Sequence, residues 1–136
     1  MAFVDSGVAC HLLGQDPARL AEPGGAAGPM VENFVLMELA RQLTWSDERA
    51  RLYHYRTKDM AEVDAVLETA DGRVVASRSR PPRRCAPRIS PVSGTWPARL
   101  GPRFVAGYVF YTGQQTLSYG GRLRALPLDA LWRLEP

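Results

Sequence analysis

Apolar residues recur along one segment of the chain at the spacing of a helix. Four of them fall on one side of a 3.6-residue period: Val31, Phe34, Val35 and Leu39. This stripe predicts a helix over Met30–Leu43, with Pro29 in the first-turn position that prolines favour. Glu32 and Glu38 fall outside the stripe, and Glu32 stands near the helix N-terminus, where a carboxylate is electrostatically favoured.

Shorter apolar segments separated by turn residues predict the strands of a sheet. Lys58-Asp59 and Asp71-Gly72 are typical of tight turns. The predicted strands or extended segments are Leu52–Thr57, Glu62–Glu68, Arg73–Val75, Phe104–Tyr111, Gln115–Tyr119 and Leu123–Leu126. At the ends of the chain, Phe3–Gly14 is predicted as a short strand leading into a brief helix, and Pro127–Trp132 as a closing helical turn. The order indicates an α/β (α+β) fold, a mixed sheet with flanking helices.

The middle of the chain departs from this pattern. Residues 76–103 contain seven arginines and no acidic residue, while the net charge of the whole chain is only +3. The same stretch holds six prolines, which are incompatible with a regular helix or a central strand. We therefore expect the third strand to break after Val75, residues 76–102 to be irregular, and the domain to be disrupted in its middle and only marginally stable.

Length and composition set further limits. A chain of 136 residues forms one domain of ordinary size. The two cysteines, Cys10 and Cys85, are far apart and lack metal-ligand spacing, so they predict neither a disulfide framework nor a zinc site. No apolar run has the length of a membrane span, and the N-terminus lacks signal-peptide features. These features favour a cytoplasmic protein without membrane contact.

Six short segments in order resemble a known prokaryotic domain. They are Phe3-Val-Asp-Ser-Gly7, Glu32-Asn-Phe-Val35, Tyr53-His-Tyr-Arg-Thr-Lys-Asp59, Glu62-Val-Asp64, Val109-Phe-Tyr-Thr-Gly113 and Ala125-Leu-Pro-Leu-Asp-Ala-Leu-Trp132. Together they resemble domain of unknown function 4143 (DUF 4143), the C-terminal domain of many prokaryotic AAA-type ATPases. The resemblance implies a core similar to PD-(D/E)XK nucleases over residues 29–136, with 1–28 a linker remnant from a preceding ATPase or winged-helix region. The sequence contains no P-loop, Gly-x-x-x-x-Gly-Lys-Ser/Thr.

The nuclease chemistry that the resemblance implies requires carboxylates that converge on a divalent cation. Such a cation polarises the phosphodiester and helps to generate the attacking hydroxide. Asp64 matches the aspartate that ends the second strand, and Glu32 matches the helical glutamate. The Glu-x-Lys of the third strand is replaced by Arg78 and Arg80. Because arginine cannot ligate a metal and repels one, we expect a catalytically inactive domain without cofactor; magnesium is implied only for a residual nuclease.

A shifted reading frame is consistent with the arginine-proline stretch. We suppose that the ancestral gene encoded Gly-Ile-Glu-Val-Lys-Ala-Ser-Ala-Thr-Val-Arg-Ala-Glu-Asp-Phe, a stretch of the kind the family contains, and we choose GC-rich codons for it. The same letters read one base later give the fifteen residues from Ala76 to Ser90. Our hypothesis is a frameshift near Val75, with the original frame restored near Arg99.

Three functional readings remain open. The first is a vestigial domain that retains a surface for contact with an ATPase domain or another protein. The second is nucleic-acid binding by the arginine-rich stretch, through phosphate contacts of Arg78, Arg80, Arg83, Arg84 and Arg88. The third is a residual metal-dependent nuclease that uses Glu32 and Asp64.

Overall fold

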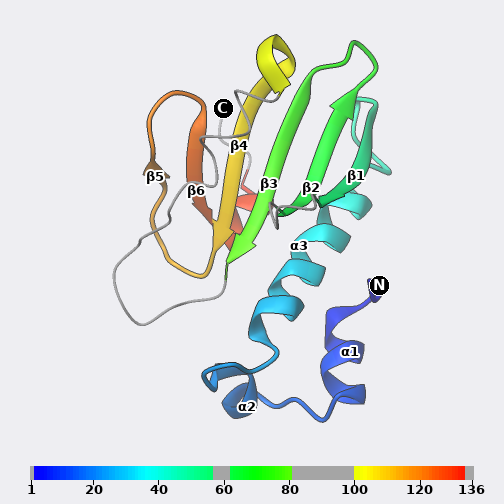
Figure 1. The fold of residues 1–136 in the computed structure, drawn as a ribbon. Helices are drawn as coiled ribbons and strands as arrows, with labels where there is room; N and C mark the ends of the chain where they lie inside the picture. Colours follow the sequence, from blue (N-terminus) through cyan, green and yellow to red (C-terminus); the bar gives the residue numbers. More distant parts are fainter. Residues whose placement is uncertain (1, 57–61, 81–99, 134–136) are drawn as a thin grey trace.

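A computed structural model describes residues 2–56, 62–80 and 100–133 of the chain. The described elements are three helices, two short 3-10 turns and six strands. Figure 1 shows their arrangement. The helices and turns are α1 (Ser6–Leu12), α2 (Pro17–Ala21), α3 (Ala27–Gln42), η2 (Gly101–Arg103) and η3 (Leu128–Leu131). The strands are β1 (Ala50–Arg56), β2 (Glu62–Thr69), β3 (Val74–Arg80), β4 (Phe104–Tyr111), β5 (Leu117–Ser118) and β6 (Leu123–Pro127).

The six strands form one mixed sheet in the order β1-β2-β3-β4-β6-β5. The first three strands are an antiparallel meander, β3 and β4 run parallel, β4 and β6 run parallel, and β5 returns antiparallel to β6. The predicted α/β fold with a mixed sheet is therefore confirmed. Strand β4 has the predicted bounds, and the extended segment expected over Gln115–Tyr119 contains the shorter strand β5.

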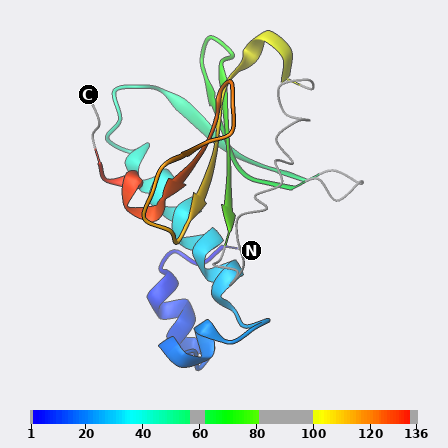
Figure 2. The same ribbon diagram turned by 90° about the vertical axis from the view of Figure 1, so that its left-hand side faces the viewer.

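Helix α3 crosses one face of the sheet and packs mainly against β3 (Figures 1 and 2). It begins at Ala27, three residues before the predicted start, and Pro29 lies in its first turn as expected. Of the apolar stripe, Val35 is fully buried. Turn η3 lies on the same side of the sheet and contacts α3, as the predicted closing helical turn.

The N-terminal residues fold into α1 and α2 beyond the N-terminal end of α3 (Figure 1). The brief helix predicted near the N-terminus is confirmed as α1, but the short strand expected before it is wrong. The main-chain N–H of Phe3 donates to Asn33 Oδ1 at 2.7 Å, and Asn33 Nδ2 donates to the carbonyl of Phe3 at 2.9 Å. The buried side chain of Asn33 in α3 thus bonds both main-chain groups of Phe3. In a sheet, a neighbouring strand would bond these groups instead.

Strand β3 does not break after Val75, so the expectation of an irregular chain from residue 76 is wrong for residues 76–80. The strand continues to Arg80 because it is paired on both sides, with β2 through Ser77 and with β4 through Arg80. Main-chain hydrogen bonds to two neighbours hold it extended whatever its side chains are. Pro81, the first residue of the proline-rich part, has no N–H to add to the ladder. Residues 81–99 lie outside the described part of the chain.

A small hydrophobic core lies within the sheet. Val63 of β2, Ala76 of β3 and Phe104 of β4 are buried together. The partly buried side chains of Val66, Leu100 and Leu123 pack against them. The consecutive strands β2 and β3 and the later strand β4 therefore share one apolar cluster, which helps to hold β3 between its two neighbours.

Candidate functional site

Asp64 is buried near the start of β2, at a step in the strand pairing. Its carboxylate Oδ2 accepts a hydrogen bond from the main-chain N–H of Ser79 at 2.5 Å. The pairing of β1 with β2 shifts register between Tyr53 and Tyr55, and His54 Nδ1 lies 3.2 Å from the carbonyl oxygen of Asp64. Such bulges are common beside functional sites, and here the bulge places Asp64 against β3. The carboxylate thereby bonds to the strand that carries Arg78 and Arg80.

Two serines of β3 lie next to this aspartate. Ser77 is 5% exposed, and the hydroxyl groups of Ser77 and Ser79 are buried. Within the described part of the chain, neither hydroxyl has a hydrogen-bond partner. A buried hydroxyl without a partner is costly, and native proteins contain few of them. Ser77 and Ser79 therefore place polar hydroxyl groups in an environment that normally contains apolar side chains.

The remaining predicted site residues do not gather around Asp64 as ligands. Arg78 lies half-buried on β3 opposite Val109 of β4, and Arg80 occupies the last position of the strand. Glu32 lies partly buried on α3. Over residues 2–56, 62–80 and 100–133, no three side chains of His, Cys, Asp or Glu are placed to hold a metal ion together. The other predicted nucleic-acid contacts, Arg83, Arg84 and Arg88, lie outside the described residues.

Glu38 is a buried carboxylate that the sequence pattern missed. Its Oε1 accepts hydrogen bonds from Trp132 Nε1 at 2.9 Å and from Gln42 Nε2 at 3.2 Å, and its Oε2 accepts from Arg41 Nη1 at 3.3 Å. Gln42 Nε2 also donates to the carbonyl of Leu131 at 2.7 Å. The ring of Trp132 packs against Phe34 with 5.7 Å between ring centroids. This network joins α3 to the C-terminal turn.

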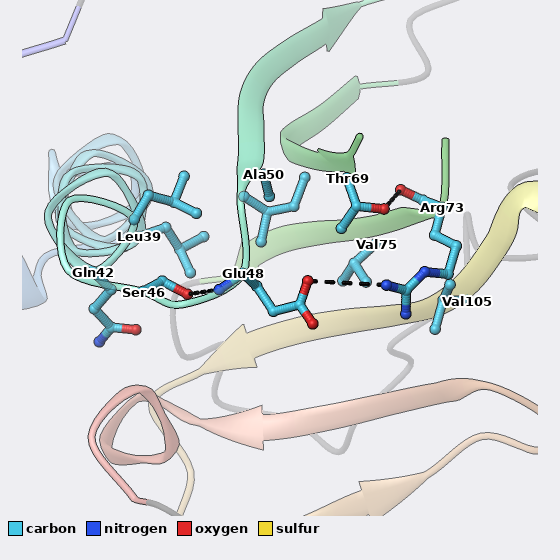
Figure 3. Close-up of a pocket in the computed structure, with 11 residues that line it drawn as sticks. Leu39, Gln42, Ser46, Glu48, Ala50, Thr69, Arg73, Val75 and Val105 are labelled. Carbon is cyan, nitrogen blue, oxygen red and sulfur yellow. Dashed lines mark hydrogen bonds and ion pairs between the residues drawn. The ribbon is translucent and has the colours of Figure 1, made fainter. Parts of the chain in front are cut away.

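A pocket of about 270 Å³ opens between the C-terminal end of α3 and the sheet (Figure 3). Its apolar lining comes from the helix and from four strands: Leu39, Leu43, Ala50, Leu67, Val75 and Val105. Glu48 and Arg73 face each other across its edge, with 3.9 Å between Arg73 Nη2 and Glu48 Oε2. The pocket thus combines an apolar interior with charged groups at its edge, the usual composition of a binding site.

Arg73 is more closely bound to Asp71 than to Glu48. Arg73 Nε lies 2.7 Å from Asp71 Oδ2, and Thr69 donates its hydroxyl hydrogen to the other oxygen of Asp71. The Thr69 hydrogen bond first, and the Arg73 guanidinium second, lower the pKa of Asp71 from 3.8 to about 2. The guanidinium of Arg73 is therefore shared between Asp71 and the Glu48 carboxylate of the pocket lining.

This arrangement predicts how Asp71 responds to acid. Because its pKa is lowered by folding, its contribution to stability is complete above the unfolded value of 3.8 and is lost as the pH falls toward about 2. We expect an NMR titration of the Asp71 carboxyl carbon to show a midpoint near 2 in the wild type. In Thr69→Val, which removes the largest cause, the midpoint should move up toward 3.8. An unchanged midpoint in that variant would assign the lowered pKa to another group.

A comparison with known protein families assigns the chain to one of them. A family model described as "Domain of unknown function (DUF4143)" matches residues 27–131, which is most of the chain. The chain belongs to the DUF4143 family. No curated protein and no solved structure matches it. The match begins at the first residue of α3 and ends at the last residue of η3, so the DUF4143 domain corresponds to the sheet, α3 and the closing turn.

The DUF4143 match also delimits the resemblance found in the sequence. Five of the six segments that carry it lie within residues 27–131, and Phe3–Gly7 lies before them with α1. Among the described elements of this DUF4143 chain, no helix combines the length and the apolar character that crossing a membrane requires.

Proposed function

We propose that the chain is the C-terminal DUF4143 domain of an AAA-type ATP-binding protein and has lost catalytic activity. The ATPase context rests on the resemblance of six segments in order to that class of proteins. In this reading residues 1–28 are the remnant of a linker to the ATPase or winged-helix region, and residues 29–136 are the nuclease-like domain. The protein acts in the cytoplasm through contacts with an ATPase domain or another protein.

One observation carries the loss of activity. Arg78 occupies the β3 position of the metal-binding glutamate, and the carboxylate of Asp64 accepts a hydrogen bond from the next main-chain N–H, that of Ser79. A guanidinium beside the metal position opposes a divalent cation by charge. The carboxylate that would otherwise bind the metal instead supports the strand. The pair Glu32 and Asp64 is then vestigial.

Nuclease assays test this proposal directly. The purified protein, incubated with Mg²⁺ or Mn²⁺ and either DNA or RNA, should cleave no faster than its Asp64→Ala variant. Metal-dependent cleavage that disappears in Asp64→Ala would identify a residual nuclease and reject the proposal. Equal cleavage by the wild type and by Asp64→Ala would come from a contaminating nuclease. The assay is then repeated with both proteins purified until that nuclease is removed.

Contact with another domain is supported by the exterior of the N-terminal segment. Val4, Val8, Leu12 and Leu13 are large apolar side chains that are more than half exposed, and Val4 is 81% exposed. Val8 and Leu12 are four residues apart in α1, so they lie on one side of the helix, and Val4 lies just before it. Apolar residues that share one face of a helix are typical of an interface. Substitution of Val8 and Leu12 by serine should reduce co-purification with the ATPase without lowering the melting temperature.

We propose that a frameshift produced the present sequence of β3 after Val75. In the shifted reading, Ser77 and Ser79 stand where isoleucine and valine were encoded. The burial of both hydroxyl groups without partners in the described part supports this proposal. The test is to resequence the gene and its upstream flank in three frames. A coding sequence without the offset rejects the frameshift.

Nucleic-acid binding by the arginine-rich stretch is the second candidate. The observation that favours it is seven arginines without an acidic residue over residues 76–103. Such binding is electrostatic, so the affinity for DNA should fall steeply with salt. Substitution of Arg83, Arg84 and Arg88 by glutamine should weaken it and flatten the salt dependence. Absence of DNA binding at low salt rejects this candidate.

A further inference from the structure

The first residues of the chain are bound to α3 through their main chain. Asn33 Oδ1 accepts a hydrogen bond from the N–H of Phe3 at 2.7 Å, and Asn33 Nδ2 donates to the carbonyl of Phe3 at 2.9 Å. About two turns further along α3, Arg41 Nη2 donates to the carbonyl of Val4 at 2.9 Å. Hydrogen bonds to main-chain groups are a common way in which a protein holds an extended peptide. Phe3 and Val4 are therefore bound to α3 as a peptide is bound to a receptor.

One side chain of this segment is recognised as well. Asn33 Nδ2 also donates to Ser6 Oγ at 2.9 Å. The Asn33 side chain is buried, so its amide depends on these contacts for its hydrogen bonds. Asp5 caps α1 by accepting from the N–H of Val8 at 2.9 Å, which starts the helix at Ser6, the residue that Asn33 contacts. The ligand of this site is thus an extended segment that ends in Asp-Ser at the start of a helix.

The N-terminal arm, residues 2–22, is otherwise held weakly on α3. Ala9 is its one buried residue, and α2 buries none. Four of its large apolar side chains are exposed: Val4, Val8, Leu12 and Leu13. A segment with so little buried apolar surface opens at low cost while the sheet remains folded. The hydrogen bonds from Asn33 and Arg41 therefore contribute much of the attachment of the arm.

The connection between the N-terminal arm and α3 is short and rich in glycine. Residues 23–25, Pro-Gly-Gly, are all exposed. Gly24 has a φ of 82°, in the left-handed region that favours glycine, and a Cβ at this position would meet no atom within 4 Å beyond its chain neighbours. Exchange of an identical element between two copies through a hinge of this kind is a low-cost route to association.

We propose that α3 carries a binding site for an extended peptide segment, which the chain fills with its own residues 3–6 and exchanges for the same residues of a second copy. Asn33 and Arg41 bind the main chain of the segment, and Asn33 selects the serine that begins the helix. This inference does not depend on the ATPase context or on the loss of nuclease activity, because none of these residues belongs to the Asp64 site.

A peptide added in trans tests the site on the full chain. The probe is acetyl-Ala-Phe-Val-Asp-Ser-Gly-Val-Ala-Ser-His-Leu, residues 2–12 with serine in place of Cys10, and it carries fluorescein at its C-terminus. The receptor is the variant Phe3→Pro, which removes the N–H that Asn33 accepts and leaves the site itself intact. We expect fluorescence anisotropy to show about fivefold tighter binding to this variant than to the wild type, the scale of one hydrogen bond. No binding to Phe3→Pro at millimolar concentration, or equal affinity for both proteins, overturns the proposal.

Changes in the peptide test which of its groups are recognised. Methylation of the main-chain nitrogen of its phenylalanine should abolish binding, because Asn33 then has no N–H to accept from. Alanine in place of the serine that corresponds to Ser6 should weaken binding about fivefold. Glutamine in place of the histidine that corresponds to His11, which is exposed in α1, is the control and should have no effect. Unchanged binding of the methylated peptide rejects recognition of the main chain.

Changes in the protein test the site residues. In the Phe3→Pro background, Asn33→Leu should abolish peptide binding, and thermal unfolding checks that this variant of a buried residue still folds. Arg41→Gln, at an exposed position, is the second variant and should weaken binding about fivefold. Arg51→Gln, also exposed but on β1, is the matched control. Undiminished binding by folded Asn33→Leu or by Arg41→Gln overturns the proposal.

Exchange between copies is tested by the oligomeric state under reducing conditions. At millimolar concentration the wild type should form dimers, detected by NMR diffusion, and Asn33→Leu and Arg41→Gln should form fewer. A wild type that stays monomeric overturns the exchange, and so do dimers that persist in both variants, because they use another interface. If a peptide of scrambled sequence binds as tightly as the probe, the site recognises main chain alone, which overturns the assignment to this segment.

Discussion

Replacement of both Ser77 and Ser79 by valine is expected to stabilise the protein by about 2–4 kcal/mol and to raise its melting temperature by roughly 5–15 °C. The two buried hydroxyl groups have lost their hydrogen bonds to water and have no partner in the described part of the chain. Valine removes this penalty, adds buried apolar surface and favours the strand. Thermal unfolding followed by circular dichroism measures the change.

Alanine variants separate the hydroxyl from the size of the side chain. Ser77→Ala and Ser79→Ala remove the hydroxyl without adding volume, so each should stabilise by about 1 kcal/mol even if valine overpacks the site. Ser118→Ala, at an exposed position of β5, is the matched control and should have little effect. Destabilisation by both alanine variants would show that the hydroxyl groups are satisfied and would remove the structural support for the frameshift.

The same positions test the origin of the strand. The shifted reading assigns isoleucine to position 77 and valine to position 79, with glutamate and lysine at positions 78 and 80. The variant with Ser77→Ile and Ser79→Val should therefore be at least as stable as the double valine variant. If isoleucine at position 77 is destabilising where valine is tolerated, the cavity does not fit the reconstructed sequence.

Local patterns predicted those elements whose determinants are close together in the chain. The apolar run Phe104–Tyr111 and the turn at Asp71-Gly72 depend on neighbouring residues, and both were predicted correctly. The end of β3 was wrong because pairing with β4, which lies more than twenty residues later in the sequence, overrides the side chains of residues 76–80. Composition describes which side chains are present, and it does not reveal that two neighbouring strands supply the hydrogen bonds.

The candidate site shows the same limit. The resemblance implies adjacent strands for Asp64 and Arg78, and the structure places them on β2 and β3. Asp64 lies near the start of β2, however, and not at the strand end that the resemblance implies. The pocket draws on residues from Leu39 to Val105, and no local pattern marks them as neighbours. Asn33 was predicted only as part of a matching segment, yet it bonds the main chain 30 residues away. Buried polar side chains with distant partners escape a hydrophobic pattern, which counts them as solvent-facing.

Glu38→Ala is expected to destabilise the protein by about 2–4 kcal/mol. The variant removes a buried carboxylate that accepts three hydrogen bonds, of which the one from Trp132 spans 94 residues of sequence. Hydrogen bonds to a charged group contribute more than neutral ones, and the donors left behind lose their acceptor. Urea unfolding followed by circular dichroism measures the loss. Glu32→Ala, on a more exposed part of the same helix, should change stability by less than about 0.5 kcal/mol.

A double-mutant cycle assigns the effect to the contact between α3 and the closing turn. Trp132→Phe keeps the aromatic packing on Phe34 and removes only the indole N–H, so it should cost about 1 kcal/mol. In the Glu38→Ala background the same change should cost almost nothing, because its acceptor is already gone. Equal costs in both backgrounds would show that Glu38 stabilises α3 through Arg41 and Gln42 alone, and that the C-terminal turn is held by the packing of Trp132.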